Sequence, residues 1–247
     1  MRDRVPAGTV DLVLTSPPYN MTKRKGGDAD SGRYDVYRDW KSEPDYIKWT
    51  QSLFAGFDTI LKKNGVVLYN FNYSIENPSL PYKLVTEICN GTPFDLVDTI
   101  VWKKSNGMPF AANQRRLARN WEFVWVFARK NEVNTFDCNK GVSKIGSQGQ
   151  TYYNIVYNFV EAKNNDGVKQ KLNQAVYSTE LCRKLLSIYA KPGSVIYDPF
   201  MGIGTTAVSA LMEGCEYIGS EISKNQVELA TSRLKGISRG KKQNIFV

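Results

Sequence analysis

The sequence predicts an α/β fold built on a doubly wound, mostly parallel sheet. Three observations support this prediction. Segments with the apolar pattern of buried strands alternate with segments of helical spacing, a glycine-rich turn joins one strand to a helix, and 247 residues suffice for one full core. Such alternation places parallel strands in one sheet through right-handed crossovers, so we expect one α/β domain rather than two.

The first predicted unit is a strand, a helix and a second strand. The stretch VDLVLT at residues 10–15 has the continuous apolar character of a strand that is covered on both faces. Apolar residues recur at helical spacing over residues 47–61, and the pair Asn64-Gly65 predicts the end of that helix. The strand VVLYNF follows at residues 66–71.

Two further strands and an irregular segment come next. The strands are predicted at residues 98–104 and 120–130, and the second is aromatic on one face, which is typical of a core-facing surface. Its aromatic residues are Trp121, Phe123, Trp125 and Phe127. Residues 131–172 are polar, rich in Asn, Gln and Gly, and lack a regular core pattern. We interpret them as an insertion that recognises a partner.

Regular alternation returns in the C-terminal part of the chain. Ser178 is the predicted N-cap of a helix that runs to Lys191, and Ser223 with Gln226 has the pattern of a capping box. Between these two caps we expect a strand at residues 195–200, a helix at 205–214 and a strand at 215–221.

Composition restricts the class of protein and the chemistry. Lys and Arg outnumber Asp and Glu by 33 to 24, and the sequence pI near 9.3 favours a polyanionic partner. The first residues show no apolar signal segment and no apolar run could span a bilayer, so we expect a cytoplasmic protein without a membrane partner. The four cysteines are widely spread and histidine is absent, so we expect no metal site and no His-based catalysis.

The stretch DPFMGIGTT at residues 198–206 has the pattern of a nucleoside-binding turn. Asp198 ends a strand, Gly202 and Gly204 lie in the turn, and Thr205 begins a helix. Glu221, at the end of the next strand, is placed to accept hydrogen bonds from ribose hydroxyls. A carboxylate beside the turn would repel a pyrophosphate, which favours a ligand with a sulfonium and no phosphate, such as S-adenosylmethionine.

The stretch TSPPY at residues 15–19 ends the first strand in a stiff, extended loop, because two prolines fix two φ angles. TSPPY together with DPFMGIGTT resembles the permuted, or β-class, DNA amino-methyltransferases, in which the catalytic motif precedes the cofactor motif. The resemblance spans nearly the whole chain. It implies a methyltransferase sheet of the seven-stranded type, in which the strands that end at Ser16 and Asp198 are neighbours at the switch point.

The resemblance also implies roles for the residues of the first motif. The Ser16 hydroxyl and the Pro17 carbonyl would accept the two amino hydrogens of the target base and aim the nitrogen lone pair at the sulfonium methyl. Pro17 and Pro18 would keep the loop stiff. Tyr19 would stack on a base flipped out of the duplex.

By the same resemblance the chain divides into three parts within one continuous domain. Residues 1–130 hold the catalytic motif, residues 131–172 form a short target-recognition insertion, and residues 173–247 bind S-adenosylmethionine. The family often has His-Pro where this chain has Asn173-Gln174. The predicted cofactor-binding residues are Asp198, Pro199, Phe200, Gly202, Gly204, Thr205, Glu221, Asn173 and Ala175.

Basic residues outside these motifs are candidates for contacts with DNA phosphates. The segment at residues 103–120 mixes Lys and Arg with Asn and Gln, which can bond base edges as well, and is the better candidate for the DNA-facing surface. The predicted DNA-binding residues are Lys23, Arg24, Lys25, Lys103, Lys104, Arg115, Arg116 and Arg119.

The sequence therefore predicts a site-specific DNA methyltransferase that acts on double-stranded DNA. Cytosine N4 is the favoured target, because Ser16 occupies the first position of the catalytic motif, where the family usually has Ser in cytosine N4 enzymes and Asp or Asn in adenine N6 enzymes. Adenine N6 is the alternative. Two further alternatives are an enzyme that methylates RNA or a protein amide, and a catalytically idle module that binds nucleic acid. The sequence leaves open whether the protein forms a homodimer and whether it has a cognate restriction endonuclease.

Overall fold

The computed structural model describes residues 4–20, 41–72, 77–107, 117–167, 177–237 and 244–246. Its elements are, in chain order, β1 (Val10–Thr15), α1 (Glu43–Ile60), β2 (Leu61–Phe71), α2 (Leu80–Gly91), β3 (Phe94–Lys104), β4 (Trp121–Arg129), the short 3₁₀ helix η1 (Lys130–Glu132), β5 (Val142–Ile145), β6 (Thr151–Tyr153), β7 (Phe159–Ala162), α3 (Thr179–Tyr189), β8 (Val195–Asp198), α4 (Thr205–Met212), β9 (Glu216–Ser220), α5 (Lys224–Lys235) and β10 (Asn244–Phe246).

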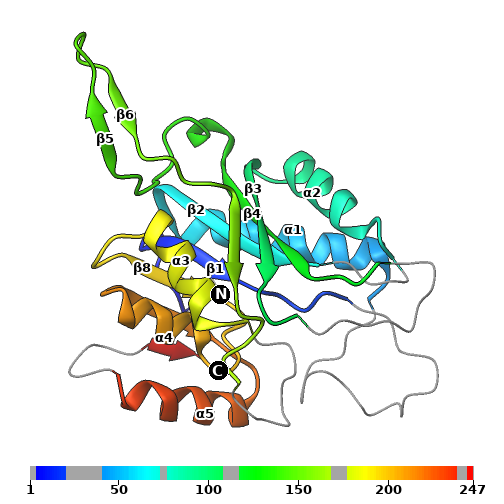
Figure 1. Cartoon of the computed structure of the whole chain (residues 1–247). Coiled ribbons are helices and arrows are strands. Elements are labelled where there is room, and N and C mark those ends of the chain that lie inside the picture. The colour runs from blue at the N-terminus through cyan, green and yellow to red at the C-terminus, as the bar shows by residue number, and fades with distance from the viewer. Residues whose placement is uncertain are drawn as a thin grey trace.

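One large sheet runs through the described part of the chain, with eight strands in the order β10-β9-β8-β1-β2-β4-β3-β7. The strands from β10 to β2 pair in parallel, β4 is antiparallel to both of its neighbours, and β7 is parallel to β3. Helices α1 and α2 cover one face, and α3, α4 and α5 cover the other (Figure 1). The prediction of a doubly wound, mostly parallel α/β sheet is confirmed.

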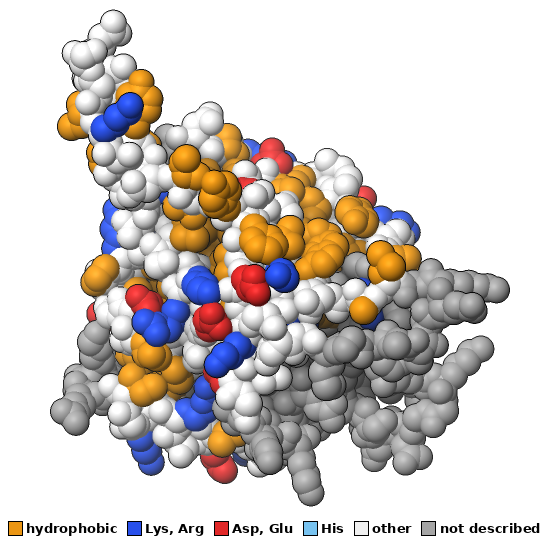
Figure 2. Space-filling model, in the orientation of Figure 1, with side chains coloured by type: hydrophobic (Ala, Val, Ile, Leu, Met, Phe, Trp, Pro, Cys, Tyr) orange, Lys and Arg blue, Asp and Glu red, His pale blue; other side chains and the backbone are white. Residues whose placement is uncertain are grey.

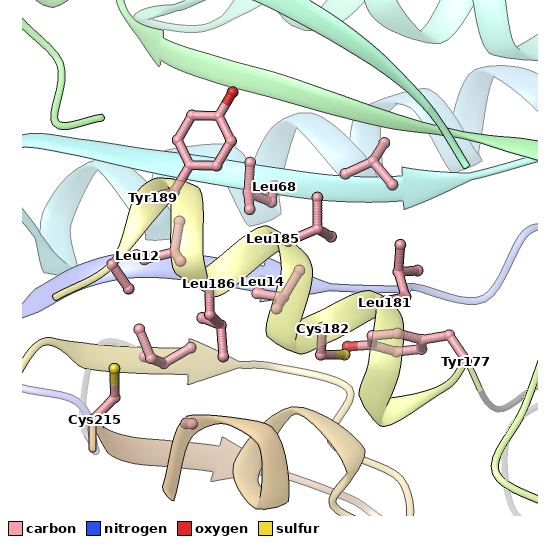
Figure 3. Packing of buried hydrophobic residues seen from close by; sticks show 14 of the residues in the cluster. Leu12, Leu14, Leu68, Tyr177, Leu181, Cys182, Leu185, Leu186, Tyr189 and Cys215 are labelled. Atoms are coloured by element: carbon pink, nitrogen blue, oxygen red, sulfur yellow. The ribbon is translucent and has the colours of Figure 1, made fainter. Parts of the chain in front are cut away.

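The core on the α3 face consists mainly of aliphatic side chains. Leu181 and Leu185 of α3 are fully buried and belong to the same cluster as Leu12 and Leu14 of β1 (Figure 3). The ring of Tyr177 lies beneath the first turn of α3, beside Cys182 (Figure 3). This layer fixes α3 over the strand that leads to Ser16.

The core on the α1 face is aromatic. Phe54 of α1 is fully buried and its ring meets four others edge-on or tilted, at centroid distances from 5.0 to 5.6 Å. Phe123, Trp125 and Phe127 of β4 are buried in this cluster, as the strand pattern predicted. Trp121, at the start of β4, is 37 % exposed and lies at the margin of the core.

Local sequence accounts for the starts of two helices but not for the end of α1. The hydroxyl groups of Ser178 and Ser223 accept hydrogen bonds from backbone N–H groups in the first turns of α3 and α5, as predicted. The predicted end of α1 at Asn64-Gly65 is wrong, because α1 ends at Ile60 and Leu61 already pairs with Val10. Asn64 has a φ of 61° and lies in a bulge, where the register of β1 and β2 shifts.

The predicted insertion at residues 131–172 contains two different structures in its described part. Strands β5 and β6 pair as a two-stranded hairpin that stands away from the body (Figure 1). The strand β7 returns to the main sheet and pairs with β3. The insertion therefore also supplies an edge strand of the core sheet, which its polar composition did not indicate.

The topology brings chemistry-bearing residues to one edge of the sheet. β1 and β8 are adjacent and parallel, although most of the chain separates them, so their carboxyl ends lie side by side. β4 runs in the opposite direction, and its first residues therefore reach the same edge. Among the described residues, no helix has the length and apolar character needed to cross a membrane.

Candidate active site

A direct hydrogen bond joins the two sequence motifs. Thr15, the last residue of β1, donates its hydroxyl hydrogen to Oδ1 of Asp198, the last residue of β8, over 2.7 Å. Both residues are buried. Ser16 and Pro199 follow directly, so the catalytic motif and the glycine turn leave the sheet from neighbouring positions, as predicted.

The Asp198 carboxylate is held at both oxygens by the chain itself. Oδ1 also accepts the backbone N–H of Phe200 at 3.0 Å, and Oδ2 accepts the hydroxyls of Thr206 at 2.6 Å and Tyr177 at 3.3 Å. Tyr177 and Thr206 also contact each other. Burial raises the pKa of Asp198 from its ordinary 3.8 to about 6, while these hydrogen bonds act in the opposite direction.

The glycine turn is closed by Glu221, which follows β9. Its Oε2 accepts the N–H of Gly202 at 2.8 Å, and its Oε1 accepts the N–H of Ser223 at 2.9 Å. Gly204 has a φ of 81° and a Cβ there would lie 3.1 Å from the Cβ of Ala230, so this position favours glycine. Each carboxylate oxygen of Glu221 thus has a further lone pair beyond the one that accepts from the backbone.

Side chains of α1 hold the two loops that leave the sheet. Tyr46 donates its hydroxyl hydrogen to the carbonyl of Pro18 over 2.6 Å. The ring of Trp49, one turn further along, lies 5.6 Å from the ring of Phe200. Pro17, Pro18 and Pro199 are buried, and Ser16 and Phe200 are partly exposed. The loops are therefore fixed from the aromatic side of the sheet.

The Tyr19 hydroxyl lies in a polar cluster behind Ser16. It is 3.0 Å from Oγ of Ser16, 2.8 Å from Oδ1 of Asn70 and 3.0 Å from Oε2 of Glu122. The Tyr19 ring packs against Phe71 with centroids 4.9 Å apart. These contacts fix the ring and tie Ser16 to the neighbouring strands β2 and β4.

Asn70 and Glu122 were absent from the predicted site, and so were Thr15, Tyr177 and Thr206. The signal for the first two was weak but present: each is a polar residue within a strand of apolar and aromatic residues. The Lys104 ammonium is 2.6 Å from Oε1 of Glu122, and its side chain is only 17 % exposed. In this structure Lys104 pairs within the chain, and its predicted contact with a phosphate stays a prediction.

The other predicted basic contacts divide into two groups. Lys103 is exposed and pairs with Glu161 of β7 at 3.2 Å, and Arg119 is exposed just before β4. The rest lie outside the residues that the structure describes, together with two predicted cofactor contacts. These residues are Lys23, Arg24, Lys25, Arg115, Arg116, Asn173 and Ala175.

Comparison with known proteins identifies the family. Residues 10–232 match the family model of N6/N4 methyltransferases that is described as DNA methylase. The chain belongs to the N6/N4 DNA methylase family. Its members use S-adenosylmethionine as methyl donor, so this DNA methylase is an S-adenosylmethionine-dependent enzyme that acts on DNA.

Relatives of this DNA methylase include type II methyltransferases. It is 26 % identical to the type II methyltransferase M.Cfr9I of Citrobacter freundii over 94 % of this chain and 84 % of the relative. It is 24 % identical to M.HinfI of Haemophilus influenzae over 94 % of this chain and 65 % of that relative.

Solved structures share the fold of this DNA methylase. The PvuII DNA methyltransferase (cytosine-N4-specific) superimposes with a TM-score of 0.70 at 17 % identity, over 97 % of this chain and 84 % of that chain. The complex of M1.HpyAVI with S-adenosylmethionine gives a TM-score of 0.62 at 22 % identity, over 92 % of this chain and 89 % of that chain.

The carboxylates of the site fit S-adenosylmethionine, the cofactor of this DNA methylase family. Glu221 can accept ribose hydroxyls at the lone pairs that its backbone contacts leave. The buried charge of Asp198 favours a cationic ligand over a phosphate.

We predict that Asp198 makes folding depend on pH in a direction unusual for a carboxylate. Its pKa of about 6 in the folded protein exceeds the ordinary 3.8, so as the pH falls the folded protein takes up a proton at a higher pH than the unfolded chain does. Its burial therefore destabilises the fold above pH 6, and this penalty disappears as the pH falls towards 4.

The measurement is urea unfolding of the wild type and Asp198→Asn between pH 4 and 7.5. Asn has the same shape but no charge, so the wild type should gain on the order of 3 kcal/mol relative to the variant as the pH falls. A difference that does not change with pH would contradict the prediction.

Proposed function

We propose that this DNA methylase transfers a methyl group from S-adenosylmethionine to N4 of a cytosine flipped out of double-stranded DNA at a specific sequence. The observation that carries the proposal is the hydrogen bond from Thr15 to Asp198. It fixes Ser16 beside the glycine turn, so a base held at Ser16 would lie next to a cofactor held at the turn.

The groups that would act on the base belong to the loop after β1. An exocyclic amino group is a poor nucleophile because its lone pair is delocalised into the ring. The Ser16 hydroxyl and the Pro17 carbonyl would accept its two hydrogens, which localises the lone pair on the nitrogen. The base would stack on the ring of Tyr19, whose position is fixed by Phe71 and by the contacts of its hydroxyl.

The groups that would hold the cofactor belong to the loops after β8 and β9. S-adenosylmethionine supplies an electrophilic methyl group on a sulfonium. Glu221 would accept the ribose hydroxyls, Gly202 and Gly204, both at positive φ, would let the backbone of the turn lie close to the cofactor, and Pro199, Phe200 and Thr205 would line the turn. Asp198 accepts four hydrogen bonds from the chain itself, so we propose that it acts through its charge and by holding the turn.

The hairpin β5–β6 is our candidate for the part that reads the target sequence. It stands clear of the body and carries hydrophobic and basic side chains (Figure 2). Tyr152 and Tyr153 are exposed, and Lys144 lies 4.9 Å from the Tyr152 ring. Such groups can contact both bases and phosphates. We propose that residues 131–172 contribute recognition through this arm, and that Lys103 and Arg119 contact phosphates.

The choice of cytosine over adenine rests on Ser16. A hydroxyl is a weaker acceptor than the carboxylate of an Asp at this position, and a pyrimidine is small enough to approach it closely. The likeness to the PvuII enzyme, whose name specifies cytosine N4, agrees with this choice. Adenine N6 is the alternative product.

Nucleoside analysis tests the proposal. Plasmid DNA treated with the enzyme and S-adenosylmethionine should yield N4-methylcytosine after digestion and mass spectrometry. N6-methyladenine in its place would overturn the choice of base but not the reaction type. Transfer of labelled methyl groups to RNA or protein, with none to DNA, would overturn the proposed substrate.

We predict that Glu221→Gln weakens cofactor binding. The variant keeps the size of the side chain but loses the charge that strengthens hydrogen bonds from the ribose, so Kd should rise about 10-fold or more. Calorimetric titration with S-adenosylmethionine measures this change. Glu228→Gln on the exposed side of α5 is the control, and equal affinities of the two variants would refute the role of Glu221.

We predict that Ser16→Ala slows methyl transfer without weakening cofactor binding. The lost hydroxyl acts on the target nitrogen, so the rate constant should fall by about 10²- to 10³-fold, comparable to the loss of one oxyanion donor. Single-turnover assays with labelled cofactor report the rate, and Ser187→Ala on the exposed face of α3 is the control. A parallel loss of cofactor affinity would indicate a structural role instead.

We predict that DNA binding depends steeply on salt, because phosphate contacts release counterions. Arg115→Ala, Arg116→Ala and Arg119→Ala should each reduce the slope of log K against log salt by about one. Fluorescence anisotropy at several salt concentrations gives the slopes. Lys191→Ala, in the loop before β8 at the opposite edge of the sheet, is the control, and unchanged slopes in the Arg variants would move the DNA-facing surface elsewhere.

A further inference from the structure

The polar cluster behind Ser16 contains one proton too few for its hydrogen bonds. The Tyr19 hydroxyl has a single hydrogen but lies 2.8 Å from Oδ1 of Asn70 and 3.0 Å from Oε2 of Glu122. An amide oxygen and a carboxylate oxygen are both acceptors only. With Glu122 as a carboxylate, one of these two oxygen–oxygen contacts therefore has no hydrogen.

The orientation of Asn70 does not relieve this shortage. Its Nδ2 is 2.9 Å from the carbonyl oxygen of Phe123 and 3.2 Å from Oε2 of Glu122, and both partners are acceptors. A flipped amide would place its oxygen against the Phe123 carbonyl and lose that bond. Oδ1 of Asn70 must then face Tyr19.

A proton added to Glu122 completes the cluster. The carboxylic acid would donate from Oε2 to the Tyr19 oxygen, and Tyr19 would donate its own hydrogen to Asn70. Lys104 faces the other oxygen of Glu122 at 2.6 Å and lies 5.0 Å from the Trp102 ring, so it balances the carboxylate charge in a largely buried site. The charged and titratable groups that the structure places at Glu122 are thus Lys104 and Tyr19.

We propose that Ser16, Tyr19 and Glu122 form a relay that removes the proton released by methyl transfer. The proposal rests on the proposed role of Ser16. When the amino lone pair forms the new N–C bond, the S–C electron pair stays on sulfur, and the nitrogen carries one excess proton. Ser16 Oγ takes that proton and passes its own to the Tyr19 oxygen, 3.0 Å away.

The relay ends on Glu122. Tyr19 passes its original hydrogen to Oε2 over 3.0 Å, so the balance is one proton gained by Glu122 and one lost by the methylated nitrogen. Once Tyr19 turns its new hydrogen to Asn70 and Ser16 donates to the Tyr19 oxygen, the cluster has a hydrogen for each of these contacts. Glu122 is the terminal base in this scheme, and it returns the proton to solvent before the next turnover.

Single-turnover rates of three variants test the relay. Glu122→Gln removes the base, and Tyr19→Phe removes the connecting hydroxyl but retains the ring that packs on Phe71. Each should slow methyl transfer by about 10²-fold, as expected for the loss of general base catalysis, with unchanged affinity for S-adenosylmethionine. The double variant should be no slower than the slower single variant, because both changes break one path.

The pH profile separates a relay from a structural role. In the wild type the rate should fall when acid protonates Glu122, and Glu122→Gln should lose this dependence. Glu213→Gln is the matched control, because it removes an ion pair of the same 2.6 Å length, with Arg183, away from the site. It should keep the wild-type rate and pH profile.

The outcomes distinguish the relay from the function on which it rests. Full activity in Glu122→Gln or Tyr19→Phe, additive losses in the double variant, or an unchanged pH profile in Glu122→Gln would overturn the relay alone. A wild type that transfers no methyl group to DNA, or a Ser16→Ala variant with full activity, would overturn the proposed function. Tyr19→Phe alone remains decisive if Glu122→Gln does not fold.

Discussion

The buried carboxylate of Asp198 is the constraint on which the site depends. It joins the ends of two parallel strands through Thr15, begins the glycine turn through Phe200, and holds the start of α4 through Thr206. A charge in such a place is costly to bury, and burial raises its pKa to about 6. The buried carboxylate is tolerated because both oxygens of Asp198 accept hydrogen bonds from donors within the chain.

The direction of β4 decides which further side chains lie close to Ser16. Because β4 is antiparallel to β2, its first residues lie at the edge where the parallel strands end. Glu122 therefore reaches the loop after β1, because it lies near the beginning of its own strand. β3 ends at the same edge and supplies Lys104. Acid, amide and ammonium thus converge without any loop having to be long.

The sequence predicted the elements that local pattern determines. Alternating strands and helices, the glycine turn and the serine caps all depend on neighbouring residues, and the structure bears them out. The end of α1 was misjudged because the pairing of Leu61 with Val10 competes with the turn signal of Asn64-Gly65. Strand register decides such pairings, and single-sequence patterns do not contain it.

The same reason explains which site residues sequence reasoning missed. Glu122 and Lys104 become partners only because β3 and β4 pair with Trp102 opposite Glu122. Before that register is known, Lys104 reads as a basic residue in a basic segment. The motif TSPPY, in contrast, can be recognised from its two adjacent prolines, and this local feature requires no knowledge of the sheet.

The hairpin β5–β6 is attached to the body at its base. Hydrogen bonds from Asp137 to Asn64 and from Asn139 to Ile188 anchor the outgoing chain, and Asn158 anchors the returning chain to β3. Residues between these anchors can lengthen, shorten or change without moving β7 or the edge that carries Ser16. The arm can therefore take new forms while the edge that carries Ser16 and Asp198 keeps its geometry, so the architecture separates a part that is free to diversify from a part held by the sheet.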